Sequence, residues 1–205
     1  MHFSKGARIS ALIIGLLIVD QIIKILIKTN MALGESISVF GNWAQIYFIE
    51  NNGMAFGMQF GGSFGKLILS LLRLALIGGI IYYLYKLVKS SAPTGVLIGI
   101  ALILVGAMGN IFDSLFYGLI FSQSTFTEVA QIFPSGGGYA QFLYGKVVDM
   151  FYFPLIDTTL PDWVPFSGGE RFIFFRPIFN FADSCITVGV IYLILFQRKF
   201  FKSQK

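Results

Sequence analysis

The sequence has few of the groups that carry nucleophilic or metal chemistry. Its 205 residues include one histidine, His2, and one cysteine, Cys185. A single cysteine excludes an intrachain disulfide. A lone histidine at the terminus leaves a serine or cysteine nucleophile without its base, and zinc sites built on histidine and cysteine lack ligands.

Charge is scarce as well. Only 12% of the residues are charged, 56% are hydrophobic, and the mean hydropathy is +0.77. A soluble domain carries about a quarter charged residues. So few charges cannot cover a water-facing surface, and the apolar excess is expected to face lipid. The length fits a single integral-membrane domain over residues 1–205.

Long apolar runs are what the sequence has instead, and a helix needs about 20 such residues to cross a bilayer. The first run leads into Asp20 and Lys24 without a small-residue cleavage site, so it is predicted to be a retained span. The prediction is an all-α membrane protein with four transmembrane helices and a small extracytoplasmic β/loop subdomain. The four spans are expected at about residues 9–27, 68–88, 95–121 and 178–196.

The distribution of basic residues predicts the orientation. Lys and Arg, without Asp or Glu, occupy the N-terminus, the turn near 86–93 and the C-terminal tail. Because basic loops stay in the cytoplasm, both termini are predicted to be cytoplasmic. The outer side then holds two segments, 29–65 and 122–177. This orientation explains the net charge of +5 better than nucleic-acid binding, so no nucleic-acid partner is expected.

Polar side chains converge at the predicted outer face. Such groups are costly in a membrane and need a reason. Two pairs with i,i+3 spacing, which places both members on one helix face, lie at outer ends of spans, and Gly106 and Gly109 would let another helix approach there. The converging residues are Asp20, Asn110, Asp113, Asn180 and Asp183 from the spans, with Asn51 and Asp149 from the outer segments.

Structural explanations exist for several of these groups. Asp20 and Lys24, four residues apart, could form only an ion pair, and Asn180 could cap a helix or bridge two helices. Cys185 is expected to pack rather than react. Arg73, just inside the outer surface, could extend its charge to the interface. Asp149 and Asp183 are harder to explain as structure, because the buried acids outnumber the available basic partners.

A pair of carboxylates is the main chemistry left. Two carboxylates held close together share one proton near neutral pH, because both cannot ionise cheaply. The ionised group can accept a proton from water while the protonated group polarises a carbonyl, which amounts to general acid–base hydrolysis of an amide. The interfacial position favours a substrate that is itself anchored in the bilayer.

Five sequence blocks together resemble the lipoprotein signal peptidase (signal peptidase II) family. Gly53 of the second block sits in a predicted turn that requires unusual backbone angles. The blocks cover most of the chain from Asp20 to Ile186. They are Asp20-Gln-Ile-Ile-Lys24, Asn51-Asn-Gly-Met-Ala-Phe56, Gly106-Ala-Met-Gly-Asn-Ile-Phe-Asp113, Val147-Val-Asp149 and Phe179-Asn-Phe-Ala-Asp183.

The resemblance implies an aspartic endopeptidase of the bacterial inner membrane that removes signal peptides from prolipoproteins, just before a diacylglyceryl-modified cysteine. It implies Asp149 and Asp183 as the catalytic pair, with no metal or organic cofactor. Membrane lipids and globomycin-type cyclic peptide inhibitors are the other implied partners. Residues that support the pair or the substrate would be Asn51, Gly53, Asn110, Asp113 and Asn180, with a structural role for Asp20.

The chain departs from the family pattern in two ways. The family usually has arginine directly after the aspartate that matches Asp113, whereas this chain has Ser114. Either the acidic site has no positive partner, or Lys146, Arg171 or Arg176 supplies one. The outer segment also looks lengthened by insertions near 121–144 and 154–175.

Two other functions fit a chain with buried acids. An ion-coupled transporter would place polar groups near the bilayer midplane and would show inverted repeats, and neither is found in the sequence. A phospholipid-synthesising transferase would need closely spaced metal-binding aspartates, whereas Asp149 and Asp183 lie far apart along the chain.

Overall fold

The computed structural model describes residues 4–53 and 62–202. Helix α1 spans Lys5–Asn30, α2 spans Gly62–Lys89 and α3 spans Thr94–Phe112. Helix α3 continues as one π-helical turn, η2 (Asp113–Tyr117), and then as α4 (Gly118–Ile120). The chain returns through α5 (Phe181–Phe196) and ends in the short α6 (Arg198–Lys202).

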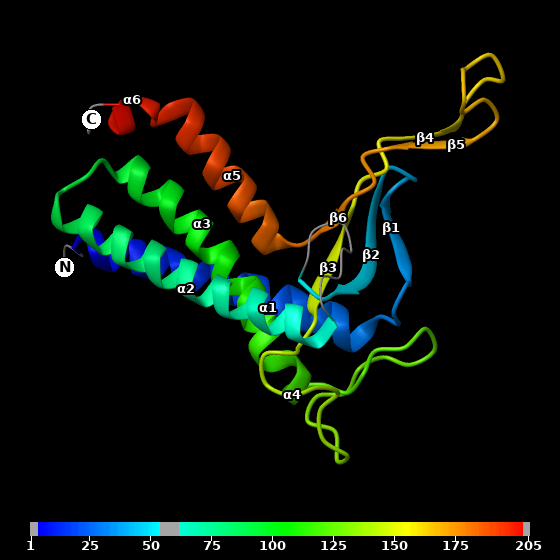
Figure 1. Cartoon of the computed structure of the whole chain (residues 1–205), viewed down its shortest axis with the longest axis horizontal. Helices are drawn as coiled ribbons and strands as arrows, with labels where there is room; N and C mark the ends of the chain where they lie inside the picture. The colour runs from blue at the N-terminus through cyan, green and yellow to red at the C-terminus, as the bar shows by residue number, and fades with distance from the viewer. Residues whose placement is uncertain (1–3, 54–61, 203–205) are drawn as a thin grey trace.

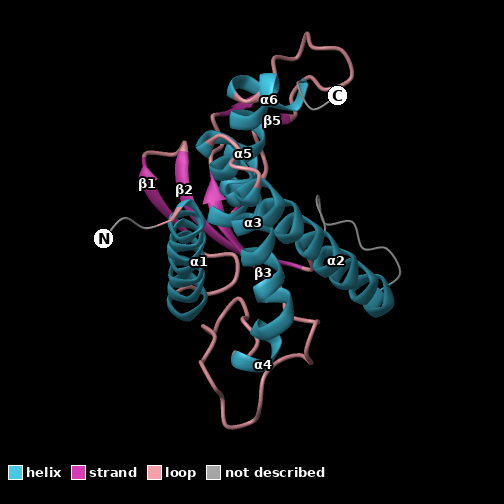
Figure 2. Cartoon of the chain, turned by 90° about the vertical axis from the view of Figure 1, so that its left-hand side faces the viewer, coloured by secondary structure: helices cyan, strands magenta, loops and turns pink. Residues whose placement is uncertain are grey.

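Helix α3 is the centre of the helical part. Figure 2 shows α1 and α2 on either side of it, and α5 packs against it as well. More than half of its span is buried, against 17% for α1 and α2. The sequence explains this position, because glycines on α3 and α5 remove the side chains that would hold the two helices apart. A Cβ on Gly99 would overlap Leu193, and a Cβ on Gly189 would lie 2.8 Å from the carbonyl oxygen of Gly99.

An antiparallel sheet closes one end of the helices, and both chain ends lie at the opposite end (Figure 1). Its strands follow the order β1, β2, β3, β6, and Asp149 on β3 pairs in register with Ile49 on β2. Their bounds are β1 Ser36–Phe40, β2 Ala44–Asn51, β3 Val147–Tyr152 and β6 Ile178–Phe179.

A separate hairpin projects from the sheet (Figure 1). It consists of β4 (Ile156–Thr159) and β5 (Arg171–Phe174), paired only with each other. This hairpin accounts for the extra length expected at 154–175. The other expected insertion, 121–144, is mostly irregular, but it contributes Phe121 and Ala130 to a buried cluster with Tyr117 and Phe48.

The structure agrees with the prediction of a membrane protein that has long apolar helices and a small sheet region, but the part of the chain that it describes does not reproduce the predicted count of four long helices. Within the described residues, three helices are long and apolar enough to cross a membrane: Lys5–Asn30, Phe64–Lys89 and Thr94–Ile120. The predicted fourth run starts too early, because Ile178 and Phe179 form a strand and Asn180 caps the helix that follows. Its 16 residues reach about 24 Å, less than a hydrocarbon core of about 30 Å. The two sheets also make the chain a mixture of helix and strand.

Candidate active site

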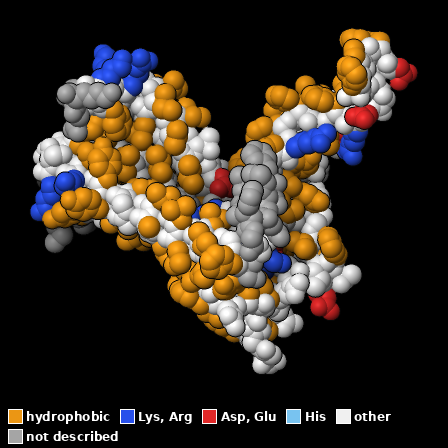
Figure 3. Space-filling view, viewed as in Figure 1, with side chains coloured by type: hydrophobic (Ala, Val, Ile, Leu, Met, Phe, Trp, Pro, Cys, Tyr) orange, Lys and Arg blue, Asp and Glu red, His pale blue; other side chains and the backbone are white. Residues whose placement is uncertain are grey.

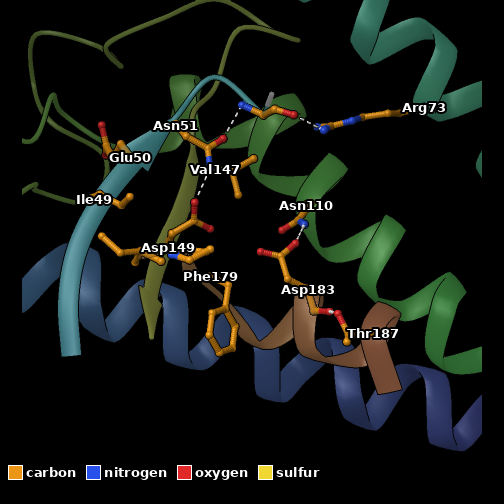
Figure 4. Close-up of a pocket in the computed structure, with 13 residues that line it drawn as sticks. Ile49, Glu50, Asn51, Arg73, Asn110, Val147, Asp149, Phe179, Asp183 and Thr187 are labelled. Carbon is orange, nitrogen blue, oxygen red and sulfur yellow. Dashed lines mark hydrogen bonds between the residues drawn. The ribbon is translucent and has the colours of Figure 1, made fainter. Parts of the chain in front are cut away.

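A cavity of about 780 Å³ lies where the sheet meets the helices. Its walls come from β2, β3, α2, α3, β6 and the first turns of α5 (Figure 4). Five of the residues expected at the site line it: Asn51, Gly53, Asn110, Asp149 and Asp183. The fold thus brings Asn51 and Asp183, which are more than 130 positions apart in the sequence, to one cavity.

Asp149 points into this cavity from β3, at the strand centre, with 2% of its surface exposed. Asn51, the last residue of β2, donates a hydrogen bond from Nδ2 to Oδ2 of Asp149. Asn180 donates to the other oxygen at 2.6 Å. Burial, and after it the nearby negative charge of Asp183, raise the pKa of Asp149 to about 7, although the hydrogen bonds from Asn180 and Asn51 oppose the shift.

Asp183 lines the cavity from the first turn of α5, and hydrogen bonds at the start of this helix hold it in position. Asn180 is the N-cap, and its Oδ1 accepts a hydrogen bond from the Asp183 backbone at 2.9 Å. In turn, Oδ2 of Asp183 accepts a hydrogen bond from the backbone N–H of Asn180 at 3.2 Å, and the two bonds together form a capping box. The other oxygen of the Asp183 carboxylate accepts from Nδ2 of Asn110 at 2.8 Å.

Two amides connect the carboxylates. Nδ2 of Asn180 donates both to Asp149 and, at 3.0 Å, to Oδ1 of Asn110. Asn110 in turn donates to Asp183. Asn180 is therefore both a helix cap and a bridge between α5, α3 and β3, so the two structural roles weighed for it coexist with a place at the site.

A second group of charges lies behind the cavity wall. Lys24 is fully buried and forms ion pairs with Asp20 at 3.1 Å and with Asp113 at 2.8 Å. Its ammonium group also donates to Oδ1 of Asn110 at 3.0 Å. Gln21 donates to Asp20 at 3.0 Å and to Asp113 at 3.1 Å. One cation and one amide thus hold two carboxylates that do not line the cavity themselves.

These buried carboxylates also fix the elements that carry the site. Asp20 accepts a hydrogen bond from the backbone of Ala182, in the first turn of α5, at 3.0 Å. Asp113 accepts one from the backbone of Val148, next to Asp149, at 3.4 Å. Asp20 therefore makes the expected ion pair, and both residues position the chain around the cavity instead of facing into it.

The positive charge at the cavity comes from Arg73, for which the sequence predicted only a position at the membrane interface. Arg73 lines the cavity from α2 and donates from Nη2 to the carbonyl oxygen of Gly53. Gly53 has φ +86, and a Cβ there would lie 2.6 Å from the guanidinium, so the position suits glycine. The clue available in the sequence was an arginine within an apolar span.

None of the three cations expected to replace the missing arginine lines the cavity. Lys146 pairs with Glu50 at 3.4 Å, and Arg171 pairs with Asp157 on the exposed hairpin at 2.5 Å. Arg176 is exposed and does not line the cavity. Ser114 is buried and donates from its hydroxyl to the carbonyl oxygen of Asn110 at 3.2 Å.

Gly106 provides the close approach that was expected, because a Cβ there would lie 2.2 Å from the carbonyl oxygen of Ala182. The expected turn after Asn51 extends beyond Gly53 into positions outside the described residues. Over residues 4–53 and 62–202, no three His, Cys, Asp or Glu side chains gather in a way that could hold a metal ion.

Comparison with known proteins gives consistent matches. A family model described as signal peptidase (SPase) II matches residues 12–199. Lipoprotein signal peptidases from two strains of Porphyromonas gingivalis are 53% identical over 192 residues, which cover 93% of this chain and 83% of each relative. That of Amoebophilus asiaticus is 36% identical over 184 residues, 88% of this chain and 73% of the relative.

The structural comparison agrees with these matches. A solved structure described as a bacterial membrane enzyme, determined by the in meso method, superimposes with a TM-score of 0.60 at 25% identity. The superposition covers 100% of this chain and 96% of that one. The whole chain, including the sheet, therefore shares the fold of a membrane enzyme.

Proposed function

Since the chain belongs to the signal peptidase II family, we propose that it is an aspartic endopeptidase that removes the signal peptide from diacylglyceryl-modified prolipoproteins. The cut falls before the lipid-modified cysteine. One observation carries the aspartic mechanism: Asp149 and Asp183 line one cavity and are connected through Asn180 and Asn110. The family membership supplies the substrate class.

The proposed reaction uses the pair as base and acid. The ionised carboxylate takes a proton from water, and the resulting hydroxide attacks the scissile carbonyl carbon. The protonated carboxyl donates its proton to the carbonyl oxygen, which gives a neutral diol. When the diol collapses, the carboxyl that took the proton from water gives it to the cysteine nitrogen, and the other carboxylate accepts a proton from a diol hydroxyl. The C–N bond breaks, the cysteine leaves as an amine, and the pair again holds one proton. A pKa of about 7 for Asp149 suits a pair that holds one proton near neutral pH.

Each neighbouring residue has a distinct proposed part. Asn51, Asn110 and Asn180 hold the two carboxylates by amide donors. Gly53 leaves room for Arg73, which donates a hydrogen bond to the Gly53 carbonyl oxygen. The positive charge of Arg73 stabilises negative charge that develops on the substrate. Asp20 and Asp113 act behind the site through their backbone contacts to Ala182 and Val148.

The proposed placement is in the bacterial inner membrane with four spans. Helix α5 is the fourth span, despite its 16 residues, and it continues through the basic α6. Both termini are cytoplasmic, because the basic segments without acidic residues lie at their end of the helices. The cavity then opens at the outer face, where a lipid-anchored substrate presents its cleavage site. Globomycin-type cyclic peptides are proposed to occupy the same cavity, and lipid surrounds the helices.

The test is cleavage of a diacylglyceryl-modified prolipoprotein by purified protein. We expect Asp149→Asn and Asp183→Asn each to lose at least about 1,000-fold in rate, with unchanged helical content and with wild-type activity surviving a chelator. Asp157→Asn is the matched control, because Asp157 lies on the exposed hairpin and pairs with Arg171. Full activity of either active-site variant would remove that residue from the mechanism, and chelator sensitivity would favour a metal-dependent reaction.

A further inference from the structure

A second cavity lies at the end of the molecule that carries the chain termini, away from the proposed catalytic residues. It measures about 390 Å³ and lies between α3 and the α5–α6 junction. Its floor and sides are apolar, formed by Ile103 of α3 with Val190, Leu193 and Ile194 of α5. Phe201 of α6 closes the apolar part.

Two cations stand at one end of this groove. Arg198 and Lys202 of α6 line it together with the apolar side chains, and both are solvent-exposed. They follow Val190 and Ile194 at intervals of four residues, so one stripe changes from apolar to basic as it runs off α5. Among the described residues, neither cation forms an ion pair with a carboxylate. Figure 3 shows Lys and Arg side chains gathered at this end beside hydrophobic ones.

We propose that this groove binds an anionic phospholipid from the leaflet that surrounds the chain termini. One acyl chain lies against Ile103, Val190 and Ile194, and the headgroup phosphate lies between Arg198 and Lys202. Two features favour a lipid. Val190 and Ile194, which line the groove, are themselves exposed, as are Val188, Ile191 and Leu195 on the same helix. The charge of the groove complements a phosphate placed at the end of an acyl chain.

Other cations at the same end differ in their surroundings. Lys86 and Lys89 at the end of α2 lie over the rings of Tyr82 and Tyr85, at 5.0 and 5.6 Å from the ring centroids. Neither of them lines the groove between α3 and the α5–α6 junction. They carry the same charge outside this groove and therefore provide a matched control for general attraction to an anionic surface.

The experiment is a lipid titration of the purified full-length protein, followed by native mass spectrometry after release from detergent micelles. The probes are phosphatidylglycerol and phosphatidylcholine with identical acyl chains. Three variants are compared with the wild type: Arg198→Gln/Lys202→Gln, Lys86→Gln/Lys89→Gln, and Val190→Trp, which fills the groove and keeps its charges. Circular dichroism checks that all of them fold.

We expect the wild type and Lys86→Gln/Lys89→Gln to prefer phosphatidylglycerol. Loss of both groove cations should weaken phosphatidylglycerol binding by roughly 25-fold, because each cation near an anionic headgroup contributes a factor of about five. Val190→Trp should weaken the binding of both lipids by displacing the acyl chain. Equal losses in the two double variants, or unchanged binding in Val190→Trp, would overturn the proposal, because surface charge alone would then account for the lipid contact.

Discussion

The environment of Asp149 differs from that of an ordinary surface carboxylate. It is buried on a central strand, faces Asp183 across a shared cavity, and receives hydrogen bonds from two amides but no direct ion pair among the described residues. Burial and the neighbouring negative charge both favour its protonated form, whereas the amide donors favour the ionised form. The balance keeps a proton available at neutral pH.

This balance predicts the pH dependence of cleavage. Above a pH of about 7 the pair loses its remaining proton, since burial raises the pKa of Asp149 to about 7, and no carboxyl is left to protonate the carbonyl oxygen. The value of kcat/KM should therefore fall by about tenfold per pH unit on the alkaline side. Initial rates with a lipidated substrate between pH 5 and 9 measure this, with circular dichroism as the control for folding. A flat profile from pH 6 to 9 would contradict the shared proton.

Arg73 supports a second prediction at this scale. Arg73→Gln removes the cation that lines the cavity and leaves the carbonyl oxygen of Gly53 without this donor. We expect kcat/KM to fall by roughly 100-fold, as for loss of a charge-stabilising donor, and Arg73→Lys to recover part of it. Arg171→Gln, on the exposed hairpin, is the control and should retain full activity. Wild-type rates in Arg73→Gln would show that the cation takes no part.

At the scale of elements, the contact between α3 and α5 decides where Asp183 lies. The site needs the first turn of α5 against Asn110 and Asp20, and Gly106 and Gly109 leave space for that turn. The buried charges of α1 then hold it there, because Asp20 accepts the Ala182 backbone hydrogen bond. Helix packing and catalytic geometry are therefore coupled.

This coupling predicts that Gly106→Ala harms both stability and activity. The added Cβ would lie 2.2 Å from the carbonyl oxygen of Ala182, so α5 must move. Overpacking of this kind costs about 1–3 kcal/mol of unfolding free energy. Gly78→Ala on α2, where a Cβ meets nothing within 4 Å, is the control and should be neutral or slightly stabilising. Thermal unfolding in micelles and the cleavage rate measure both effects, and equal behaviour of the two variants would contradict the close-packing argument.

At the scale of the whole molecule, charge and apolar surface are separated along the helix direction. The described Lys and Arg of α6 and the α2–α3 turn lie at the end with the termini, whereas the sheet and the β4–β5 hairpin lie at the other end (Figure 1). Exposed apolar side chains cover the helices between them (Figure 3). This arrangement suits a chain that crosses a bilayer with its sheet on one side.

Cysteine labelling tests the proposed orientation. In a Cys185→Ala background, Thr158→Cys on β4 and Ser90→Cys at the α2–α3 turn both place a thiol at an exposed position. A membrane-impermeant maleimide added to spheroplasts should label Thr158→Cys at once and Ser90→Cys only after permeabilisation. The opposite pattern would invert the topology. Labelling of both positions before permeabilisation, in sealed spheroplasts, would mean that α3, the one proposed span between them, does not cross the membrane.

The sequence by itself determined the membrane class, the separation of basic from acidic segments and the residues now found around the cavity. These properties are local, since they depend on composition, on i,i+3 spacing and on motifs that keep their order. Asp20, Asn51, Gly53, Asn110, Asp113, Asp149, Asn180 and Asp183 could be named this way, although their catalytic or supporting roles remain proposals.

Tertiary structure alone decided which of these residues face the cavity and which lie behind it. Asp20 and Asp113 turn toward Lys24, Asn180 bridges both carboxylates, and Arg73 takes the place expected for Lys146, Arg171 or Arg176. The rotation and depth of each helix set these contacts, and they depend on packing between segments far apart in sequence. The start of α5 was likewise decided by the Asn180 cap and the pairing of β6 with β3, because hydropathy cannot distinguish an apolar strand from the helix that follows it.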